Sequence, residues 1–374
     1  MKTYLREDFV KRMDAVFRKY EEKTAIVDYL SEKYAERYTY GQLREVTMQV
    51  GEALRAQGIE KTERVAVLAR PSAQSAMMLL ALSYLGYVAV LPDISLPVAE
   101  QNKLLRYVEP SAVVIAEERY ALLDGEFRAS VPVFRLLSNQ MDFGLLNPGR
   151  EKREKTTEQG DEDVMAIIFS SGDVACKKGS EITYQAMMHS ADTAATHAAY
   201  DDHSRFLHVL PQTQDAGYSM LFINFQLGSE MAFVPEFSAE DLMMGLRTYE
   251  PTHLVMIPKS YDTIRKKMEE EIAKRSKGVR MLYASCRGVT AYLRRHTGYQ
   301  MKLLMRPFYA SEFGRNIHVL GCGAAPCSME TVQFFRDMGI SFPNACGSEE
   351  ESFPVHCGIS TREWYPDQGA EFGL

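Results

Sequence analysis

VMAIIF (Val164–Phe169) runs directly into SSGDVACKKG (Ser170–Gly179). The first six residues are apolar throughout, whereas a strand with one face in water would alternate apolar and polar residues. A strand that is apolar on both faces is typical of a parallel sheet covered by helices on both sides. This stretch therefore predicts an α/β fold.

Short apolar runs of the same kind recur along the chain and predict further strands. They are Arg64–Leu68, Tyr87–Leu91, Ala112–Ile115, Arg205–Leu210, Glu230–Val234 and His253–Ile257. Between them lie amphipathic segments such as Tyr40–Gln57 and Pro97–Glu109, which predict helices. Because strands that alternate with helices are typical of βαβ units, we predict two doubly wound, mostly parallel sheet subdomains with helices on both faces.

A charged segment divides this pattern. Between Ser138 and Asp163 the sequence includes NPGREKREKTTEQGDED, which has almost no apolar residues and predicts a solvated linker or a long surface loop. The chain has 374 residues, more than one compact core usually holds. We therefore predict a first α/β subdomain in residues 1–150, with a linker at about 138–163, and a second in residues 164–374. A ligand is expected near the carboxyl ends of the strands, at or between the two subdomains.

Composition and charge exclude several classes of protein. With 46% hydrophobic and 25% charged residues, the chain is neither disordered nor a coiled coil. Its net charge of −7 argues against nucleic-acid binding by bulk charge. The first twenty residues alternate charges, which predicts an amphipathic helix rather than a signal peptide. The uncharged stretch Pro71–Pro92 contains polar residues, so we predict a buried helix and strand there and no transmembrane segment.

The cysteines and histidines show no metal-binding pattern. No spacing among the six cysteines is typical of a zinc site or a disulfide scaffold, so a reducing cytoplasm is the simplest compartment. Cys322 and Cys327 bracket Gly-Ala-Ala-Pro and could flank a ligand, although buried structural thiols are the more common case. No histidine pair has the spacing of a helical zinc site, which favours packing or surface roles. The twenty methionines are expected mainly as core filler, and pliable acyl pockets also use them.

The segment Ser170–Thr183 is the first candidate for chemistry. A turn of small residues after a buried strand can bring backbone N–H groups and a lysine to a polyphosphate, because small side chains let the backbone approach the phosphates closely. It is not a Walker loop, since no Gly-Lys-Ser/Thr follows. Turns of this composition are also common connectors, so the segment alone does not decide a function.

Five segments in the same order resemble the adenylate-forming superfamily, which includes acyl-CoA synthetases, luciferases and the adenylation domains of nonribosomal peptide synthetases. They are Arg37–Ser95, Phe169–Gly179 at the family's phosphate loop, Leu210–Tyr218, Leu320–Ser328 and Asn344–Glu350. The helical segment Pro258–Arg306 is most similar to the long-chain fatty acyl-CoA synthetase branch.

The resemblance implies a two-step ligase reaction. A carboxylate attacks the α-phosphate of ATP with Mg²⁺ bound, pyrophosphate leaves, and the acyl adenylate is captured by a thiol such as coenzyme A. The chain ends at Leu374, before the family's C-terminal domain, which carries a lysine for this reaction. We therefore expect most of the large domain and none of the C-terminal one.

The resemblance also implies a role for each matched residue. Lys178, beside the β- and γ-phosphates, and Glu350, holding Mg²⁺, would be the catalytic residues. Gln214, at the family's usual histidine position, and Gly217 would border the acyl pocket. The nucleotide-binding residues would be Ser170, Ser171, Gly172, Lys178, Gly179, Gly323, Ala324, Ala325, Cys346, Gly347, Ser348 and Glu349.

Three departures from the family pattern leave two functions open. Asp173 and Glu349 stand at hydroxyl positions, and a carboxylate beside a triphosphate repels it. Cys346 replaces the tyrosine on which adenine would stack. The chain is therefore either an AMP-forming acyl-CoA ligase for a medium or long carboxylic acid, with a fatty acid expected, or a non-catalytic homologue that binds an acyl group, a nucleotide or a protein partner. The oligomeric state is also left open, a homodimer included.

Overall fold

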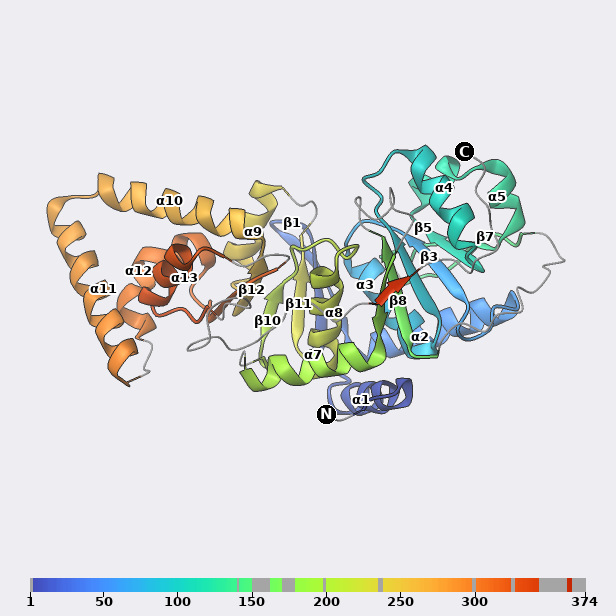
Figure 1. The fold of residues 1–374 in the computed structure, drawn as a ribbon, viewed down its shortest axis with the longest axis horizontal. Helices are drawn as coiled ribbons and strands as arrows, with labels where there is room; N and C mark the ends of the chain where they lie inside the picture. The colour runs from blue at the N-terminus through green and yellow to red at the C-terminus, as the bar shows by residue number, and fades with distance from the viewer. Residues whose placement is uncertain are drawn as a thin grey trace.

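A computed structural model of the chain describes residues 3–139, 141–149, 162–169, 179–197, 200–234, 238–297, 301–323, 327–342 and 362–364. These residues form two mixed, mostly parallel sheets flanked by helices (Figure 1). The predicted α/β class is therefore confirmed.

The larger sheet is eight-stranded in the described residues, in the order β14-β9-β8-β4-β3-β5-β6-β7. The five strands from β8 to β6 run parallel, and antiparallel strands lie at both edges. Their bounds are β3 (Arg64–Leu68), β4 (Val88–Pro92), β5 (Ala112–Ile115), β6 (Val133–Arg135), β7 (Leu145–Asn147), β8 (Val164–Phe169), β9 (Gly179–Thr183) and β14 (Arg362–Trp364).

The smaller sheet has six strands among the described residues, in the order β13-β12-β10-β11-β1-β2. All neighbours are parallel except β2, which pairs with β1 as an antiparallel hairpin. The bounds are β1 (Thr24–Ser31), β2 (Tyr34–Thr39), β10 (Arg205–Leu207), β11 (Glu230–Phe233), β12 (His253–Met256) and β13 (Val319–Cys322).

Helices cover both faces of each sheet (Figure 1). Several begin with a side-chain cap; Thr39 accepts a hydrogen bond from the backbone N–H of Gln42 at the start of α2. The bounds are α1 (Arg6–Lys19), α2 (Tyr40–Ala56), α3 (Ala73–Leu85), α4 (Val98–Val108), the 3₁₀ helix η1 (Glu117–Leu122), α5 (Gly125–Ser130), α7 (Tyr184–His197), α8 (Asp215–Leu227), α9 (Ala239–Thr248), α10 (Pro258–Lys274), α11 (Lys277–Thr297), α12 (Lys302–Phe313) and α13 (Met329–Asp337).

Alternating side chains of each buried strand enter two different cores. In β3, Val65 and Val67 belong to a central core between the two sheets, whereas Ala66 and Leu68 belong to an outer core beneath α4. A third core lies on the far face of the smaller sheet, beneath α9 to α13. Strands in the middle of such a stack have no wet face, which explains why their sequences are apolar at every position.

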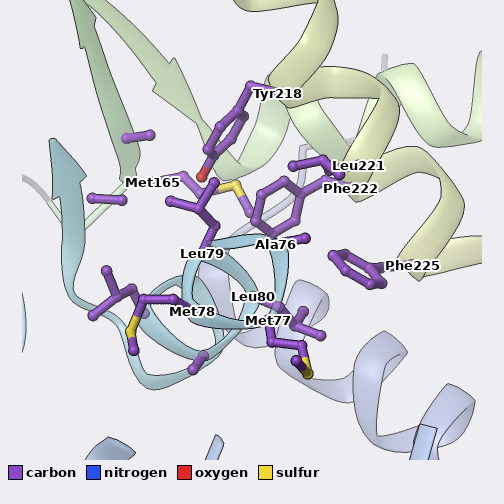
Figure 2. Close-up of a cluster of buried hydrophobic side chains, with 14 of the residues drawn as sticks. Ala76, Met77, Met78, Leu79, Leu80, Met165, Tyr218, Leu221, Phe222 and Phe225 are labelled. Carbon is purple, nitrogen blue, oxygen red and sulfur yellow. The ribbon is translucent and has the colours of Figure 1, made fainter. Parts of the chain in front are cut away.

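The centre of the molecule is the contact between α3 and α8 in the central core. Eleven of the thirteen residues of α3 are buried, so this helix has no solvent face. Figure 2 shows Tyr218 and Phe222 of α8 directed toward Ala76 and Leu79 of α3. The Tyr218 hydroxyl lies 3.2 Å from Ser83 Oγ, which gives this buried phenol a hydrogen-bond partner. The predicted buried helix and strand in Pro71–Pro92 are confirmed by α3 and β4.

The two sheets do not follow the division of the chain that the sequence suggested at residue 150. The N-terminal hairpin β1–β2 joins the smaller sheet, where β1 pairs with β11. The strands β8 and β9 join the larger sheet, where β8 pairs with β4. Each sheet is therefore built from both halves of the chain, because strand pairing is decided by long-range contacts and not by order along the chain.

The other predicted elements compare as follows with the structure. All seven predicted strands are present, with small shifts at their ends, and the amphipathic segments form α2 and α4. The expected linker contains the edge strand β7, so its first part is ordered sheet, and residues 150–161 lie outside the described residues. None of the described helices combines the length and the apolar character that a membrane span requires.

Candidate active site

The carboxyl ends of several parallel strands meet where the two sheets adjoin. In the larger sheet Pro92 pairs with Phe169, so β4 and β8 end side by side. In the smaller sheet β10 leads into the turn Pro211–Gln214, and β13 leads into Gly323. Ligands of open α/β sheets bind outside such strand ends, so this region is the candidate site.

Most of the predicted nucleotide-binding residues cannot be placed. Those outside the described residues are Ser170, Ser171, Gly172, Lys178, Ala324, Ala325, Cys346, Gly347, Ser348, Glu349 and Glu350. Their roles therefore stay predictions. The described site residues are Gly179 and Gly323 of the nucleotide-binding set, and Gln214 and Gly217 of the acyl pocket.

Gly179 begins β9, which runs antiparallel to β8. The chain therefore leaves the sheet after Phe169 and returns beside the same strand. A Cβ atom on Gly179 would lie 2.7 Å from Ile167 Cγ2 and 2.9 Å from Phe169 Cζ. Such contacts are too short, so only glycine allows β9 to approach β8 this closely. This packing explains Gly179 without a phosphate contact.

Gly323 follows β13 and lies against the segment that enters α8. Its backbone N–H donates to the Met256 carbonyl at 3.0 Å, which holds it beside β12. A Cβ atom at this position would lie 3.1 Å from Leu210 Cδ1 and 3.3 Å from Ala216 Cβ. The predicted adenine-side glycine and the predicted acyl-side segment are therefore neighbours.

Gly217 and Gln214 shape the turn between β10 and α8. The Gln214 backbone N–H donates to the Pro211 carbonyl at 3.1 Å, which closes the turn. A Cβ atom on Gly217 would lie 2.0 Å from the same carbonyl oxygen, so this position requires glycine. Gly217 is thus a structural residue behind the turn, whereas Gln214 is exposed and lines a cavity.

This cavity has a volume of about 330 Å³, at the lower end of the range of small-molecule sites. Its lining comes from both sheets: Val67, Ala69, Pro71, Leu79, Leu91, Asp93, Ile94, Ser95 and Pro211–Gln214. The wall beneath α3 and the ends of β3 and β4 is mostly apolar, and the polar groups lie on the two turns. Asp93, which directly follows Pro92, accepts hydrogen bonds from the backbone N–H and the hydroxyl of Ser95.

Gln212 is a residue of this site that the sequence interpretation missed. Its side chain is almost fully buried, and its Oε1 accepts a hydrogen bond from Ser75 Oγ at 2.7 Å. Its Nε2 is buried and has no hydrogen-bond partner among the described residues, and Gln212 is one of the residues that line the cavity. A buried amide N–H without a partner costs free energy, which a ligand acceptor would recover. Only its position in the sequence, two residues before Gln214 in the same turn, could have suggested that Gln212 belongs to the site.

Cys322 and Cys327 differ from the expected separate thiols, because a disulfide joins them. The intervening segment brings their Cα atoms to 6.3 Å from one another, and both side chains are buried. The spacing of five residues did not predict this disulfide, because the distance between the two cysteines depends on how β13 and α13 are placed in the fold. The bond closes the segment that starts at Gly323.

The described histidines divide between the predicted packing and surface roles, since His208 and His253 are buried whereas His203 and His296 are exposed. His208 follows β10 and is fully buried between Phe206 and Phe233. Burial lowers the pKa of His208 to about 3, because the imidazolium would lose its hydration. Across the described part of the chain, no cluster of three or more His, Cys, Asp or Glu side chains could hold a metal ion.

Comparison with known proteins agrees with this geometry. The family model for AMP-binding enzymes matches residues 13–370. A 2-succinylbenzoate–CoA ligase of Bacillus cereus is 27% identical over 237 residues, covering 63% of this chain and 46% of that protein. A chloroplast long-chain-fatty-acid–[acyl-carrier-protein] ligase of Arabidopsis thaliana is 22% identical, covering 95% of this chain and 58% of that protein. The chain thus spans about half the length of these curated relatives.

Solved structures share the fold. The N-terminal domain of FACL13 from Mycobacterium tuberculosis matches with a TM-score of 0.62 and 17% identity, over 91% of this chain and 75% of that one. An O-succinylbenzoate coenzyme A synthetase from Bacillus subtilis, in complex with AMP, matches with a TM-score of 0.60 and 15% identity, over 88% and 71%. Since the family model covers nearly all of the sequence, this chain belongs to the AMP-binding enzyme family.

Proposed function

We propose that this chain is the large-domain part of an AMP-forming ligase that activates a carboxylic acid with ATP. A carboxylate oxygen of the acid forms a bond to the α-phosphorus, the bond from that phosphorus to the bridging oxygen breaks, and pyrophosphate leaves. The product is an acyl adenylate. Coenzyme A is the proposed thiol acceptor in the second step.

The observation that supports this proposal most directly is the placement of the cavity. It lies beside the point where β8 and β4 end together, and the segment after β8 is the one that resembles a phosphate loop. An acid bound in the cavity would have its carboxylate near that segment. Holding two reactants at one place supplies much of the rate in such a transfer, because the orientation is fixed before the reaction.

The residues after β8 and β13 would hold the nucleotide. Backbone N–H groups and hydroxyls of Ser170 and Ser171 would donate to phosphate oxygens, and Lys178 would balance their charge. Glu350 would hold Mg²⁺, which draws negative charge from the phosphates when it is bound. The described residues fit the acyl group, since the cavity has an apolar wall and the free amide hydrogen of Gln212.

The cavity favours a compact acid with a hydrogen-bond acceptor. At about 330 Å³ it suits a medium-sized acid better than a long alkyl chain. The Nε2 of Gln212 would donate to a carbonyl, hydroxyl or carboxylate on that acid, because this group has no protein partner in the described residues. Among acids of the predicted medium or long range, we therefore propose a medium one.

A second candidate function rests on the sequence of the nucleotide segments. Asp173 and Glu349 add two carboxylates where the family has hydroxyl groups. Carboxylates near a triphosphate weaken its binding by repulsion. On this reading the protein binds an acyl group or a partner without turnover.

Acid-dependent exchange between ATP and pyrophosphate separates the two candidates. The assay uses the full-length gene product, with calorimetry for ATP binding and a panel of medium acids with and without a second polar group. The ligase proposal predicts exchange that Lys178→Ala abolishes. Silence in the exchange assay together with no ATP binding would overturn it. Gain of ATP binding in Asp173→Thr/Glu349→Thr would then support the non-catalytic function.

Gln212→Leu tests the acid preference separately. We expect it to lower exchange with acceptor-bearing acids by roughly tenfold relative to plain alkyl acids, since one buried hydrogen bond is lost. The matched control is Gln49→Leu on the exposed face of α2, which should leave the ratio unchanged. An unchanged ratio in Gln212→Leu would exclude the proposed contact while leaving the ligase activity intact.

The cytoplasm is the proposed compartment. There the glutathione pool would keep Cys322 and Cys327 as thiols, because disulfides are rare in reducing compartments. Rapid alkylation of cell extracts followed by mass spectrometry would report the state of this pair.

A further inference from the structure

Helix α11 presents apolar side chains to solvent along most of its length. Met281, Leu282, Val289 and Tyr292 are 62%, 57%, 47% and 61% exposed. Spacings of three, seven, eight and eleven residues place these side chains on adjoining parts of one helix face. Leu303, at the start of the neighbouring helix α12, is 75% exposed. Single exposed apolar residues are ordinary on a protein surface, whereas an aligned group of this size marks a contact surface.

The opposite face of α11 holds the helix on the protein. Tyr283 and Thr290 are buried there, and Arg287 and Arg294 donate to the two carboxylate oxygens of Asp337 at 3.2 and 3.4 Å. These contacts fix the rotation of α11 about its axis. The exposed apolar residues therefore point away from the body of the molecule.

The charge of α11 differs from that of the whole chain. The chain carries a net charge of −7, yet α11 contains five Lys or Arg residues and no Asp or Glu. Arg287 and Arg294 are paired with Asp337. Lys277, Arg280 and Arg295 are exposed, and none of them forms an ion pair within the described residues. The acidic run Glu269–Glu271 belongs to α10, where Glu269 pairs with Arg265.

The position of α11 favours a flat partner. Figure 1 shows α10 extending from the smaller sheet and α11 crossing its far end, at the extremity of the molecule and remote from β3 and β8. A projecting helix with an apolar face can lie directly on a planar surface.

We propose that α11 docks on the surface of an anionic lipid bilayer. The helix would lie in the plane of the interface, with Met281, Leu282 and Tyr292 among the acyl chains and headgroups. Lys277 and Arg295, which flank the apolar residues on the helix surface, would lie at the level of the lipid phosphates. An exposed apolar stripe beside cations that form no ion pair with the described residues is the pattern of helices that bind anionic membranes without crossing them. This surface is separate from the active site, so the proposal stands whether or not the chain is a ligase.

Vesicle flotation of the full chain tests the proposal. We expect the protein to float with vesicles of equal parts phosphatidylcholine and phosphatidylserine, to bind pure phosphatidylcholine weakly, and to be released by salt. Met281→Gln/Leu282→Gln should lower the partition coefficient at least about tenfold, since two buried apolar side chains are lost. Lys277→Gln/Arg295→Gln should lower it by roughly fivefold for each charge and should weaken the salt dependence.

A control uses exposed apolar residues elsewhere on the surface. Val98→Gln/Leu122→Gln changes two such residues beside the larger sheet and should leave flotation unchanged. Circular dichroism and melting temperature confirm that each variant is folded. Failure of the wild-type protein to float with anionic vesicles would overturn the proposal and leave an acidic protein as the partner to seek. Equal flotation of the wild type and Met281→Gln/Leu282→Gln would overturn it as well.

Discussion

At Gly217 the fold leaves no room for a side chain. Gly217→Ala would place a methyl group 2.0 Å from the Pro211 carbonyl oxygen, and this backbone atom cannot move without opening the turn. We expect the free energy of unfolding to fall by at least ~2 kcal/mol, as in other overpacked sites. Urea unfolding measures the change.

The control for Gly217 is a glycine with open space around it. Gly288 lies within α11 and would have no atom within 4 Å of an added Cβ. Gly288→Ala should raise the free energy of unfolding by up to about 1 kcal/mol, because alanine favours the helix more than glycine does. If Gly217→Ala lost no more stability than a typical surface variant, the turn would be able to adapt to the added methyl group, contrary to this prediction.

His208 should make the protein less stable in acid. Its pKa is about 3 in the folded protein and near the ordinary value of 6.5 when unfolded, so only the unfolded chain takes up this proton between those values. The contribution of neutral His208 to the free energy of unfolding is therefore fully present above pH 6.5 and is lost as the pH falls toward 3. The loss is about 1.4 kcal/mol per pH unit.

Urea unfolding at pH 7 and pH 5 measures this effect. In His208→Leu the difference in unfolding free energy between the two pH values should shrink by about 2 kcal/mol, since leucine does not titrate. His203 is 89% exposed at its side chain, and His203→Gln should leave the difference as in the wild type. The same pH dependence in His208→Leu and wild type would mean that buried His208 does not carry the effect.

At the scale of elements, the attachment of α11 depends on Asp337 of α13. This carboxylate accepts hydrogen bonds from Arg287 and Arg294 and is itself buried. Asp337→Asn keeps the shape but replaces one acceptor oxygen with an NH2 donor and removes the negative charge, so one arginine loses its acceptor and the other keeps only a neutral one. We expect a loss of about 2 kcal/mol in the local stability of the helix. Hydrogen exchange of residues 277–297 measures it.

An exposed ion pair gives the comparison for Asp337. Glu100 and Lys103 of α4 lie 2.9 Å apart, with both side chains in water. Glu100→Gln should change hydrogen exchange by less than about 0.5 kcal/mol, because exposed pairs contribute little. Unchanged exchange of α11 in Asp337→Asn would indicate that Tyr283 and Thr290 are sufficient to hold the helix.

At the scale of the whole molecule, the two halves of the chain should depend on one another for folding. The fragment 1–149 lacks β11, the partner of β1, and β8, the partner of β4. The fragment 162–374 lacks α3, against which α8 packs in the central core. We expect neither fragment to show a cooperative thermal transition in calorimetry, because each exposes the central core.

Co-expression provides the positive control for the fragments. Together they contain every described strand, and we expect a cooperative transition to return when both are made in one cell. A cooperative transition in fragment 1–149 alone would mean that the two sheets fold as independent units, as the division at residue 150 would suggest.

The sequence by itself determined the element types and the family. A strand such as Val164–Phe169, buried on both faces, is apolar at each position, and amphipathic helices repeat on a period set by the helix itself. Both signals depend only on near neighbours in the chain. The order of the five matched segments determined the resemblance, which the family model bears out over residues 13–370.

Tertiary structure alone decided which strands pair, where the cavity lies and which polar atoms lack partners. Distant parts of the chain come together where β1 pairs with β11 and where Ser75 donates to the buried amide of Gln212. The Cys322–Cys327 disulfide depends on the chain turning back after β13. Local periodicity carries no record of such contacts, because the same alternation allows a strand to join either sheet. The outward face of α11 was fixed in the same way, by a carboxylate from a different helix.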